Sequence, residues 1–403
     1  MQTSTDKIIN DESQYIVHTY NRPPFMLVSG EGVMLYDSEG NAYTDWVSGI
    51  AVNALGYGDE ELTQAVGQAM ATGMVHVSNL YHTAPHVELA EMLCEKSFAD
   101  KVFYCNSGAE AVEGALKFAR RVAYNKGLTS KTDIVSFSGA FHGRTMGALA
   151  VTPREQYQVP FKPMMPGAVI AEYNNLESAK AVINANTAAV IVEPVQGEGG
   201  IHIATSEFLQ GLRDLCDKHD VLLIFDEIQC GLGRTGKLWA HQWSEVTPDI
   251  MTLAKPLGGG LPMGAIMVTN TVGEHIQPGD HGSTFAAGPV VSSAANVVVK
   301  RVSQPEFLAH VCDMGDYLTE CLSEINSPLI KEIRGKGLMA GIELTIEAAK
   351  LVSAGYDHGL ILVNAGPNVL RFVPPLIITK KHVDELIGHL TQMLADAEVT
   401  ANE

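Results

Sequence analysis

Short, almost wholly apolar runs alternate with longer amphipathic segments through the middle of the chain. Five of these runs are typical of strands buried on both faces: residues 102–105, 133–137, 188–195, 221–226 and 249–254. Residues 109–125 and 206–220 instead repeat their apolar positions with helical spacing, and Ser206 is expected to cap the second helix. This alternation predicts an α/β fold with a mostly parallel sheet flanked by helices.

The two ends of the chain depart from this alternation. Residues 33–46 alternate around a polar Asp-Ser-Glu-Gly-Asn turn, which predicts a β-hairpin, whereas residues 1–20 look irregular. Beyond residue 302, a long helix (305–325) and a final helix (380–396) enclose short apolar runs. We therefore expect a smaller α+β domain built from both ends. The predicted divisions are an N-terminal arm and hairpin at 1–48, a large domain at 49–301 and a small domain at 302–403.

Composition narrows the class of protein. Of 403 residues, 46% are hydrophobic and 18% are charged, as in ordinary globular chains. The net charge, 27 minus 46 or −19, argues against a nucleic-acid partner. No apolar run approaches the roughly 20 residues that cross a bilayer, and the N-terminus resembles neither a secretory nor a transit peptide. The six scattered cysteines include no CxxC pair, so we expect reduced thiols, no metal site and a cytoplasmic location.

Polar groups at the ends of four predicted strands indicate one shared site, because ligands of parallel sheets bind at the carboxyl ends of the strands. The triplet Ser107, Gly108 and Ala109 opens a helix, where free N–H groups and the helix dipole favour a phosphate. An ordinary serine cap explains the same residues. After the next strand, Phe141 can stack on a flat ligand and Arg144 can clamp a carboxylate, although a structural arginine is the alternative.

Asp226 and Lys255 follow the last two of these strands. Asp226 comes after five apolar residues, and a buried carboxylate needs a cationic partner, which a simple buried ion pair would also provide. Lys255 stands between an apolar run and the sequence PLGGG. Burial there would lower the pKa of the lysine and make its amine a nucleophile towards carbonyls, although an isolated lysine at a loop start is by default a surface residue.

Together the four groups require a ligand with a phosphate, a flat ring, a ring atom that can be cationic, and an aldehyde. Pyridoxal 5′-phosphate has all four. Asp226 would keep the ring nitrogen protonated so that the ring can accept electrons from the substrate. Lys255 would join the aldehyde and, once released by substrate, would carry a proton.

Six motifs, in this order and spacing, make the chain resemble class III pyridoxal-phosphate aminotransferases of fold type I over nearly its whole length. They are NSGAEA (106–111), FHGRT (141–145), EPVQGEGG (193–200), FDEIQCGLGRTG (225–236), TLAKPLGGGLPMGA (252–265) and HGSTF (281–285). Weaker features are most similar to N-acetylornithine aminotransferases: TYNRPP (19–24), GIAVNALG (49–56), SNLYHT (78–83) and RFVPPL (371–376). The chain departs from the family pattern at GYGDEE (56–61), AEAVEGA (109–115) and AAGP (286–289).

The resemblance implies a role for each matching residue. Lys255 would hold the cofactor and Asp226 would pair with its ring nitrogen. The other cofactor-binding positions would be Ser107, Gly108, Ala109, Phe141, Ile228, Gln229 and Thr284. Thr284 would reach the cofactor of a second subunit, which implies a homodimer with shared active sites. Substrate would be bound by Arg144, Glu198, Arg371, Tyr20 and Ser283. In this scheme Arg144 takes the α-carboxylate, while Glu198 and Arg371 pair for an ω-amine donor and separate for glutamate or 2-oxoglutarate.

The implied reaction moves the terminal amine of N-acetylornithine to 2-oxoglutarate in a ping-pong cycle, a step of arginine biosynthesis. Another ω-aminotransferase, acting on 4-aminobutyrate, ornithine, succinylornithine or succinyldiaminopimelate, fits the same motifs. A glutamate-semialdehyde aminomutase usually lacks the arginine at position 144, and a decarboxylating transaminase is a remoter alternative. A non-catalytic relative would usually lose Lys255 or Asp226. A nicotinamide oxidoreductase needs GxGxxG after an early strand, and GLGRTG at 231–236 lacks that spacing.

Overall fold

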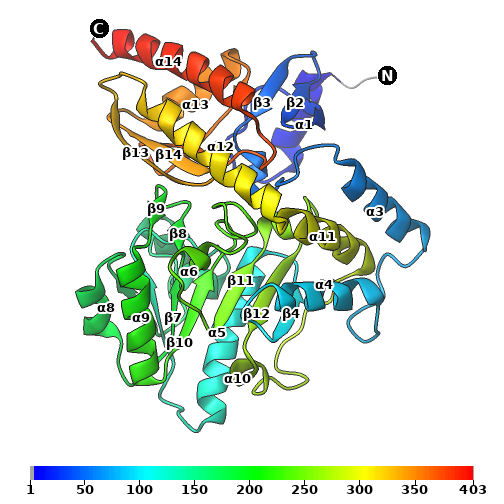
Figure 1. Cartoon of the computed structure of the whole chain (residues 1–403), viewed down its shortest axis with the longest axis vertical. Coiled ribbons are helices and arrows are strands. Elements are labelled where there is room, and N and C mark those ends of the chain that lie inside the picture. The colour runs from blue at the N-terminus through cyan, green and yellow to red at the C-terminus, as the bar shows by residue number, and fades with distance from the viewer. Residues whose placement is uncertain (1–3, 403) are drawn as a thin grey trace.

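The computed structural model describes residues 4–402, and a seven-stranded sheet forms its centre (Figure 1). The strands, in spatial order, are β4 (Lys101–Cys105), β12 (Gly264–Val268), β11 (Ile250–Leu253), β10 (Leu222–Asp226), β7 (Thr187–Val192), β5 (Asp133–Phe137) and β6 (Ala168–Ala171). β10 is parallel to β7 and β11, and β5 is parallel to β6 and β7. β12 alone is antiparallel to its neighbours β11 and β4. The predicted mostly parallel sheet is confirmed.

The sequence analysis missed two strands of this sheet and made one too long. It did not recognise β6 or the antiparallel β12. The predicted strand at 188–195 is two strands, because β7 ends at Val192 before Glu193 and Pro194. Proline cannot donate to a strand ladder, so the chain leaves the sheet there. The next residues form β8 (Val195–Gln196), which pairs with β9 (His202–Ile203) in a separate two-stranded sheet.

Helices flank the sheet on its two faces, as predicted (Figure 1). They are α4 (Ala84–Glu95), α5 (Gly108–Asn125), α6 (Met146–Ala150), α7 (Glu155–Gln158), α8 (Leu176–Val182), α9 (Ser206–His219), α10 (Asn270–Gly273) and α11 (Pro289–Val302). A further helix, α3 (Glu60–Ala71), packs against α11 at the side of the molecule. The prediction of Ser206 as the cap of α9 was wrong by one residue. Thr205 has an extended backbone, and its side chain accepts a hydrogen bond from the Phe208 amide, so Thr205 is the cap and Ser206 is already helical.

Two smaller sheets lie beyond one end of the central sheet, at the top of Figure 1. One contains β1 (Leu27–Glu31), β2 (Met34–Asp37), β3 (Ala42–Asp45) and β15 (Leu360–Ile361). The other contains β13 (Ile330–Lys336), β14 (Met339–Leu344), β17 (Val369–Phe372) and β16 (Val363–Ala365). The predicted hairpin is confirmed as β2 and β3. Since β15 pairs in parallel with β3, both ends of the chain contribute to one sheet. The division of the chain at residues 48 and 301 stays a prediction.

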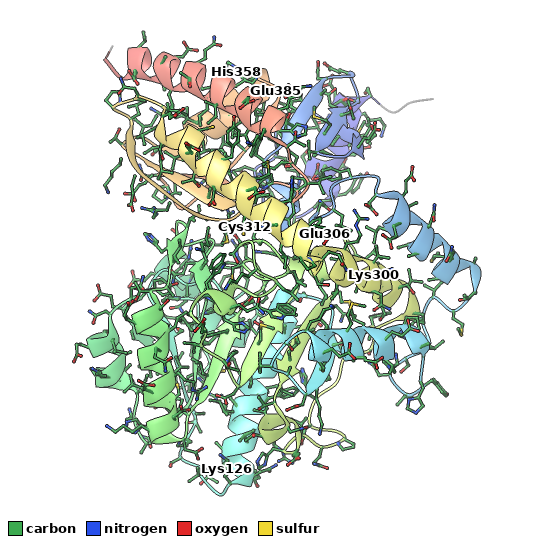
Figure 2. The ribbon with its side chains drawn as sticks, viewed as in Figure 1. Lys126, Lys300, Glu306, Cys312, His358 and Glu385 are labelled. Atoms are coloured by element: carbon green, nitrogen blue, oxygen red, sulfur yellow. The ribbon has the colours of Figure 1, made fainter. Side chains whose placement is uncertain are left out.

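Three helices accompany these smaller sheets: α12 (Pro305–Ser323), α13 (Ala348–Asp357) and α14 (Lys380–Asn402). α12 starts next to α11 and extends towards the smaller sheets, and Cys312 lies on it between the two parts of the molecule (Figure 2). The Cys312 thiol lies 3.4 Å from the carbonyl oxygen of Gly236. A Cβ at Gly236 would come within 2.3 Å of that sulfur, so the GLGRTG segment needs this glycine for α12 to pack against it.

The N-terminal segment differs from its prediction as an irregular arm. Residues 5–15 form the helix α1 (Thr5–Tyr15), whose cap Ser4 accepts a hydrogen bond from the Lys7 amide. The helix buries none of its residues and has few apolar side chains, so the sequence indicated no helix that packs against a core there. Within residues 4–402, no helix combines the length and the apolar character that crossing a membrane would require.

Candidate active site

Asp226 lies buried at the carboxyl end of β10, where a network of hydrogen bonds fixes its carboxylate. The Oδ1 atom accepts bonds from the Ile228 amide and the Thr252 hydroxyl, each at 3.1 Å. Thr252 reaches it because β10 and β11 pair Asp226 directly with Thr252. The Oδ2 atom lies 2.7 Å from Nδ1 of His142, which comes from the loop after β5. Three different elements therefore hold one negatively charged group in a single orientation.

A second buried carboxyl group belongs to this cluster. Glu193 follows β7, is 6% exposed, and accepts a hydrogen bond of 3.1 Å from the Phe141 amide. Burial raises the pKa of Glu193 to about 7; the charge of Asp226 adds to this effect and that of His142 opposes it. Burial alone would lower the pKa of His142, but the hydrogen bond and charge of Asp226 outweigh it and raise the pKa. The protonated form of His142 is thus favoured.

Lys255 follows β11 directly, as its sequence position indicated, and has a positive φ of 41°. The side chain is half-buried, and within residues 4–402 its amine makes no hydrogen bond or ion pair. Burial lowers the pKa of Lys255 to about 8, an effect that the charge of Glu198 opposes and that of Arg371 adds to. Among the glycines after Lys255, Gly259 admits Leu62 of α3, since a Cβ there would lie 2.9 Å from the Leu62 side chain.

The N-terminus of α5 lies beside this cluster. Ser107 caps the 18-residue helix, and its side chain accepts a hydrogen bond from the Glu110 amide. A Cβ at Gly108 would lie 2.9 Å from Cδ1 of Ile228, so the glycine allows the helix to approach the loop after Asp226. Ala109 in turn contacts the loop after β5 at Gly143. The structure thereby brings the phosphate-binding candidates, the ring-stacking candidates and Asp226 together.

Glu198, Gln229 and Arg371 form a hydrogen-bonded group on the other side of Lys255. Arg371 comes from β17, is 1% exposed, and donates from Nη1 to Oε1 of Glu198 at 2.5 Å and to Oε1 of Gln229 at 2.9 Å. Burial opposes ionisation of Glu198, but the positive charges of Arg371 and Lys255 hold its pKa below the ordinary value. The smaller sheets thus supply one cation to a site otherwise built on the central sheet.

Arg144 lies exposed at the rim of the same site. Its guanidinium carbon lies 6.0 Å from the centre of the Phe141 ring and 4.4 Å from that of Tyr157. Among the residues that the structure describes, Arg144 makes no ion pair or side-chain hydrogen bond. A guanidinium held against aromatic rings without an acidic partner is suited to bind a carboxylate from solution.

Three predicted residues lie outside this constellation. Tyr20 is 65% exposed on the segment between α1 and β1, and its ring lies 5.7 Å from the Arg22 guanidinium. Thr284 is exposed on the loop before α11. Ser283 accepts a hydrogen bond of 2.9 Å from the side-chain amide of Asn106, close to the α5 N-terminus of the same chain.

The sequence analysis missed Glu193 and Thr252. The sequence signal that could have located Glu193 differs from that for Thr252. Glu193 ends a buried apolar run, which is the same signal that identified Asp226. Thr252 lies inside a run of apolar residues, and only the pairing of β10 with β11 brings it to Asp226. His142 was quoted within FHGRT, but its contact with Asp226 was not predicted.

Comparison with known proteins identifies the family. The chain belongs to the class III aminotransferases, whose family model matches residues 15–394. It is 49% identical to the mitochondrial acetylornithine aminotransferase of Alnus glutinosa, over 98% of this chain and 88% of that protein. It is 41% identical to the acetylornithine aminotransferase of Methanocaldococcus jannaschii, over 98% of this chain and 99% of that protein.

Solved structures agree with this assignment. The chain is similar to N-acetylornithine aminotransferase from Stenotrophomonas maltophilia, with a TM-score of 0.82 and 37% identity over 97% of this chain and 99% of that one. It is also similar to ornithine aminotransferase from Toxoplasma gondii, with a TM-score of 0.94 and 28% identity over 99% of this chain and 96% of that one.

Class III aminotransferases depend on pyridoxal 5′-phosphate, and the site has the groups that this cofactor needs. The α5 N-terminus offers backbone N–H groups to a phosphate. Asp226 offers a fixed negative charge to a ring nitrogen, and the Lys255 amine makes no bond to another described residue. The chain is therefore a pyridoxal-phosphate-dependent aminotransferase of the fold type I architecture.

Proposed function

We propose that the chain transfers the terminal amine of N2-acetylornithine to 2-oxoglutarate, giving N-acetylglutamate 5-semialdehyde and glutamate. The observation that carries this proposal is the presence of two arginines with different partners in one cleft. Arg144 is free to bind a carboxylate, whereas Arg371 is neutralised by Glu198. Such a site can accept a donor with one carboxylate far from its amine, and a second substrate with two. The names of the similar acetylornithine aminotransferases support this choice of donor.

The two substrates would use the arginines differently. The α-carboxylate of N2-acetylornithine would bind Arg144 and leave the Glu198–Arg371 pair closed. Glutamate carries a second carboxylate beside its amine, and this group would displace Glu198 and bind Arg371. The Gln229 side chain, which accepts from Arg371 and donates to Glu198 at 3.4 Å, would remain a partner for Arg371 during the change.

The chain's own residues would perform the proton chemistry. When bound, the cofactor supplies the electron sink that lets a proton leave the carbon bearing the amine. Ser107, Gly108 and Ala109 would hold its phosphate, Phe141 and Ile228 would enclose its ring, Gln229 would lie near its phenolic oxygen, and Asp226 would face its ring nitrogen. Lys255 would move the proton, and a pKa of about 8 allows the amine both to accept and to return one near neutral pH.

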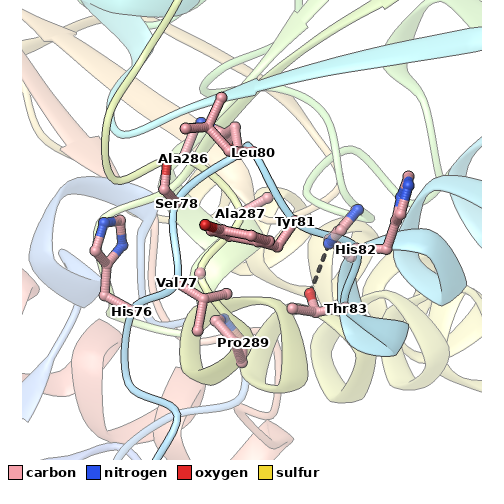
Figure 3. A pocket seen from close by; sticks show the side chains of 13 residues that line it. His76, Val77, Ser78, Leu80, Tyr81, His82, Thr83, Ala286, Ala287 and Pro289 are labelled. Carbon is pink, nitrogen blue, oxygen red and sulfur yellow. Dashed lines mark hydrogen bonds between the residues drawn. The ribbon is translucent and has the colours of Figure 1, made fainter.

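We also propose a homodimer with shared active sites. A small hollow is lined by residues 76–83, His86 and residues 286–289, from the loop before α4 and the segment before α11 (Figure 3). Near it, large apolar side chains face solvent: Leu80 is 83% exposed, and Tyr81 and Phe285 are each 67% exposed. Exposure on this scale supports a protein partner there. Thr284, in the same segment, would then reach the second subunit's cofactor, while Ser283 and Tyr20 would line the substrate pocket.

Sedimentation analysis tests the dimer. We expect twice the mass of one chain, and we expect Thr284→Ala to weaken cofactor binding without altering that mass. A monomeric wild type that turns over at full rate would contradict the shared site.

The cytoplasmic location also stays a prediction. All six cysteines are free thiols, but two of the similar relatives are named mitochondrial.

Single-substrate reactions of the cofactor-loaded enzyme test the choice of donor. N2-acetylornithine, ornithine and 4-aminobutyrate are added separately, without keto acid, and the absorption band of the bound cofactor is followed. We expect N2-acetylornithine to remove the band fastest. Faster reaction with ornithine would favour the alternative donor suggested by the similarity to an ornithine aminotransferase. Faster reaction with 4-aminobutyrate would likewise replace the proposed donor, while transaminase chemistry would stand in both cases.

A further inference from the structure

A tyrosine outside the predicted site lies between two arginines at the rim of the cleft. The Tyr157 ring centre lies 4.4 Å from the guanidinium carbon of Arg144 and 5.9 Å from that of Arg154. Both distances are within the roughly 6 Å over which a guanidinium is attracted to the face of an aromatic ring. The distance from Arg144 to the Phe141 ring is longer, at 6.0 Å. Tyr157 is therefore the nearest aromatic partner recorded for Arg144.

Tyr157 is held in place by its neighbours on α7. The side-chain amide of Gln158 donates to the carbonyl oxygens of Leu149 and Thr152, at 3.0 and 2.9 Å. These bonds tie the four-residue α7 to the end of α6. The Tyr157 amide also donates to the Arg154 carbonyl at 2.9 Å. The Tyr157 ring thus projects from the short helix α7. This helix is held against the segment after β5, which also carries Arg144.

Arg154 links this arrangement to Glu198. Its Nη2 atom donates to the main-chain oxygen of Glu198 at 2.6 Å and lies 3.4 Å from that of Gly139. An open hollow borders these residues, lined by Gly139, Arg154, Glu155, Gln156, Glu198, Gly199 and Gly366. The Glu198 side chain would move during the reaction. The Arg154 guanidinium, which bonds to the Glu198 main chain, keeps the turn between β8 and β9 in place. The same cation contacts the ring that contacts Arg144.

A free arginine side chain needs such support. Arg144 is exposed and has no acidic partner among the described residues, so nothing except the aromatic rings limits its rotamers. Ordering a long side chain on binding costs conformational entropy, and a side chain that is already ordered avoids that cost. Pre-ordering matters most for the first carboxylate, because every substrate of the proposed reaction has one that would bind Arg144.

We propose that Tyr157 is a positioning residue that holds the Arg144 guanidinium ready for a substrate carboxylate, with Arg154 contacting the same ring. This inference rests on the proposed function only in taking Arg144 as the carboxylate-binding group. Tyr157 contributes to discrimination between amine donors that carry a carboxylate and amine donors that lack one. Its aromatic ring, and not its hydroxyl group, performs this role.

Tyr157→Leu and Tyr157→Phe separate the ring from the hydroxyl. Tyr157→Leu keeps an apolar side chain but removes the ring, and we expect it to raise KM for N2-acetylornithine and for 2-oxoglutarate about tenfold. We expect kcat to stay within about twofold, because Tyr157 would support binding and not the chemical step. Tyr157→Phe should behave like the wild type. A loss in Tyr157→Phe as large as in Tyr157→Leu would overturn the role of the ring.

A donor without the carboxylate gives the sharper readout. N-acetylputrescine is N2-acetylornithine without its α-carboxylate, so it cannot use Arg144. The ratio of kcat/KM for N2-acetylornithine over N-acetylputrescine should fall about tenfold in Tyr157→Leu. A merely structural defect would lower both values together and leave the ratio unchanged, which would overturn the proposal. In an Arg144→Ala background, Tyr157→Leu should have no further effect on this ratio.

Two variants guard against misfolding and nonspecific effects. Gln158→Ala loosens α7 without touching the ring, and we expect it to lower the same ratio by a smaller factor. This variant provides the test if Tyr157→Leu does not fold. Tyr124→Leu is the matched control, because Tyr124 on α5 also lies near an arginine, 5.7 Å from the Arg121 guanidinium, on a surface away from Arg144. It should leave the ratio unchanged. An unchanged ratio in both Gln158→Ala and Tyr157→Leu would overturn the proposal.

Failure of this proposal can be told apart from failure of the proposed function. If the wild type reacts fastest with ornithine, the same ratio is measured with ornithine and putrescine, which differ in the same carboxylate. Loss of discrimination in Tyr157→Leu would then support the positioning role even though the donor assignment had failed. Retained discrimination would overturn the positioning role with either donor.

Discussion

The active site has a floor, which includes Asp226 and Lys255, and a rim, which includes Arg144 and Glu198. The two parts are built in different ways. At the floor, Asp226 is buried and receives bonds from three elements, and strand pairing sets the position of Thr252 beside it. At the rim, Arg144 is exposed and is held by ring contacts from a four-residue helix. In the proposed reaction, the floor would face the cofactor and the rim would face the substrates. Chemistry common to all substrates therefore rests on the rigid sheet, and discrimination between substrates rests on side chains that can rearrange.

The largest effect should come from removing the amine at the floor. We expect Lys255→Ala to lower kcat about 10⁴-fold or more for every donor, since it removes both the nucleophile and the proton carrier. Steady-state turnover with several donors measures this, and the melting temperature serves as the control for folding. Residual activity of Lys255→Ala that differs widely between donors would contradict the distinction between floor and rim.

A smaller but still uniform loss should follow from Asp226→Asn. The amide keeps the shape of the side chain but removes the negative charge that faces the ring nitrogen and His142. We expect kcat to fall about 10²- to 10³-fold, equally for each donor, as when one preorganised electrostatic group is lost. The ratio of kcat values for two donors measures the uniformity. A loss confined to one donor would place Asp226 with the rim.

Substitution at the rim should instead separate the two half-reactions. Glu198→Gln leaves Arg371 buried without its charged partner, and an unpaired buried cation is costly. The amine-donor half-reaction with N2-acetylornithine should slow about tenfold, because no second carboxylate arrives to replace Glu198. The half-reaction with glutamate should be nearly unchanged. Rapid mixing of the loaded enzyme with each donor measures the two rates, and equal slowing of both would contradict this role.

The smallest effect concerns the pH dependence of stability. The pKa of Glu193 is raised from 4.5 to about 7, so the unfolded chain ionises this carboxyl more readily than the folded one. Its contribution to stability is therefore greatest below pH 4.5 and declines as the pH rises to about 7. Glu193→Gln keeps the acceptor for the Phe141 amide and removes the titration. Relative to the wild type, we expect its melting temperature to gain about 2 °C between pH 5 and pH 8.

Measurement of the melting temperatures of the wild type and of Glu193→Gln in matched buffers checks this prediction. The hydrogen bond and charge of Asp226 raise the pKa of His142 against the opposing effect of burial, so the stability that its protonated form contributes is lost as the pH rises through that raised value, in the same direction as the effect of Glu193. The remaining pH dependence of the variant should therefore keep its sign. A difference between variant and wild type that is constant from pH 5 to pH 8 would show that Glu193 does not titrate in this range.

The floor of the site was predictable from the sequence because the sheet sets it. A carboxylate directly after five apolar residues has to lie at the end of a buried strand, and this located Asp226. A lysine between a buried strand and a glycine-rich loop located Lys255 by the same logic. The family motifs then supplied the residues around them. The carboxyl ends of neighbouring parallel strands meet at one edge, so these residues had to come together.

The rim was less predictable because its contacts join segments with no periodic pattern. Tyr157 belongs to a short helix that no apolar repeat marks, and its contact with Arg144 depends on how the loop after β5 folds back. Thr252 was hidden for another reason: it interrupts an apolar run, and only strand register reveals its partner. The helix α1 was missed since it buries nothing and contains few apolar residues, so it does not resemble a helix that packs against a core.

The pairing of β15 with β3 has a consequence for the order in which the chain is made. The hairpin β2–β3 is synthesised long before Leu360 and Ile361, which cover its edge. Until then, β3 exposes an edge whose amides at Thr44 and Trp46 later donate to the carbonyls of Gly359 and Ile361. The central sheet can assemble while translation continues. The region that supplies Arg371 can be completed only after β15 has also been synthesised.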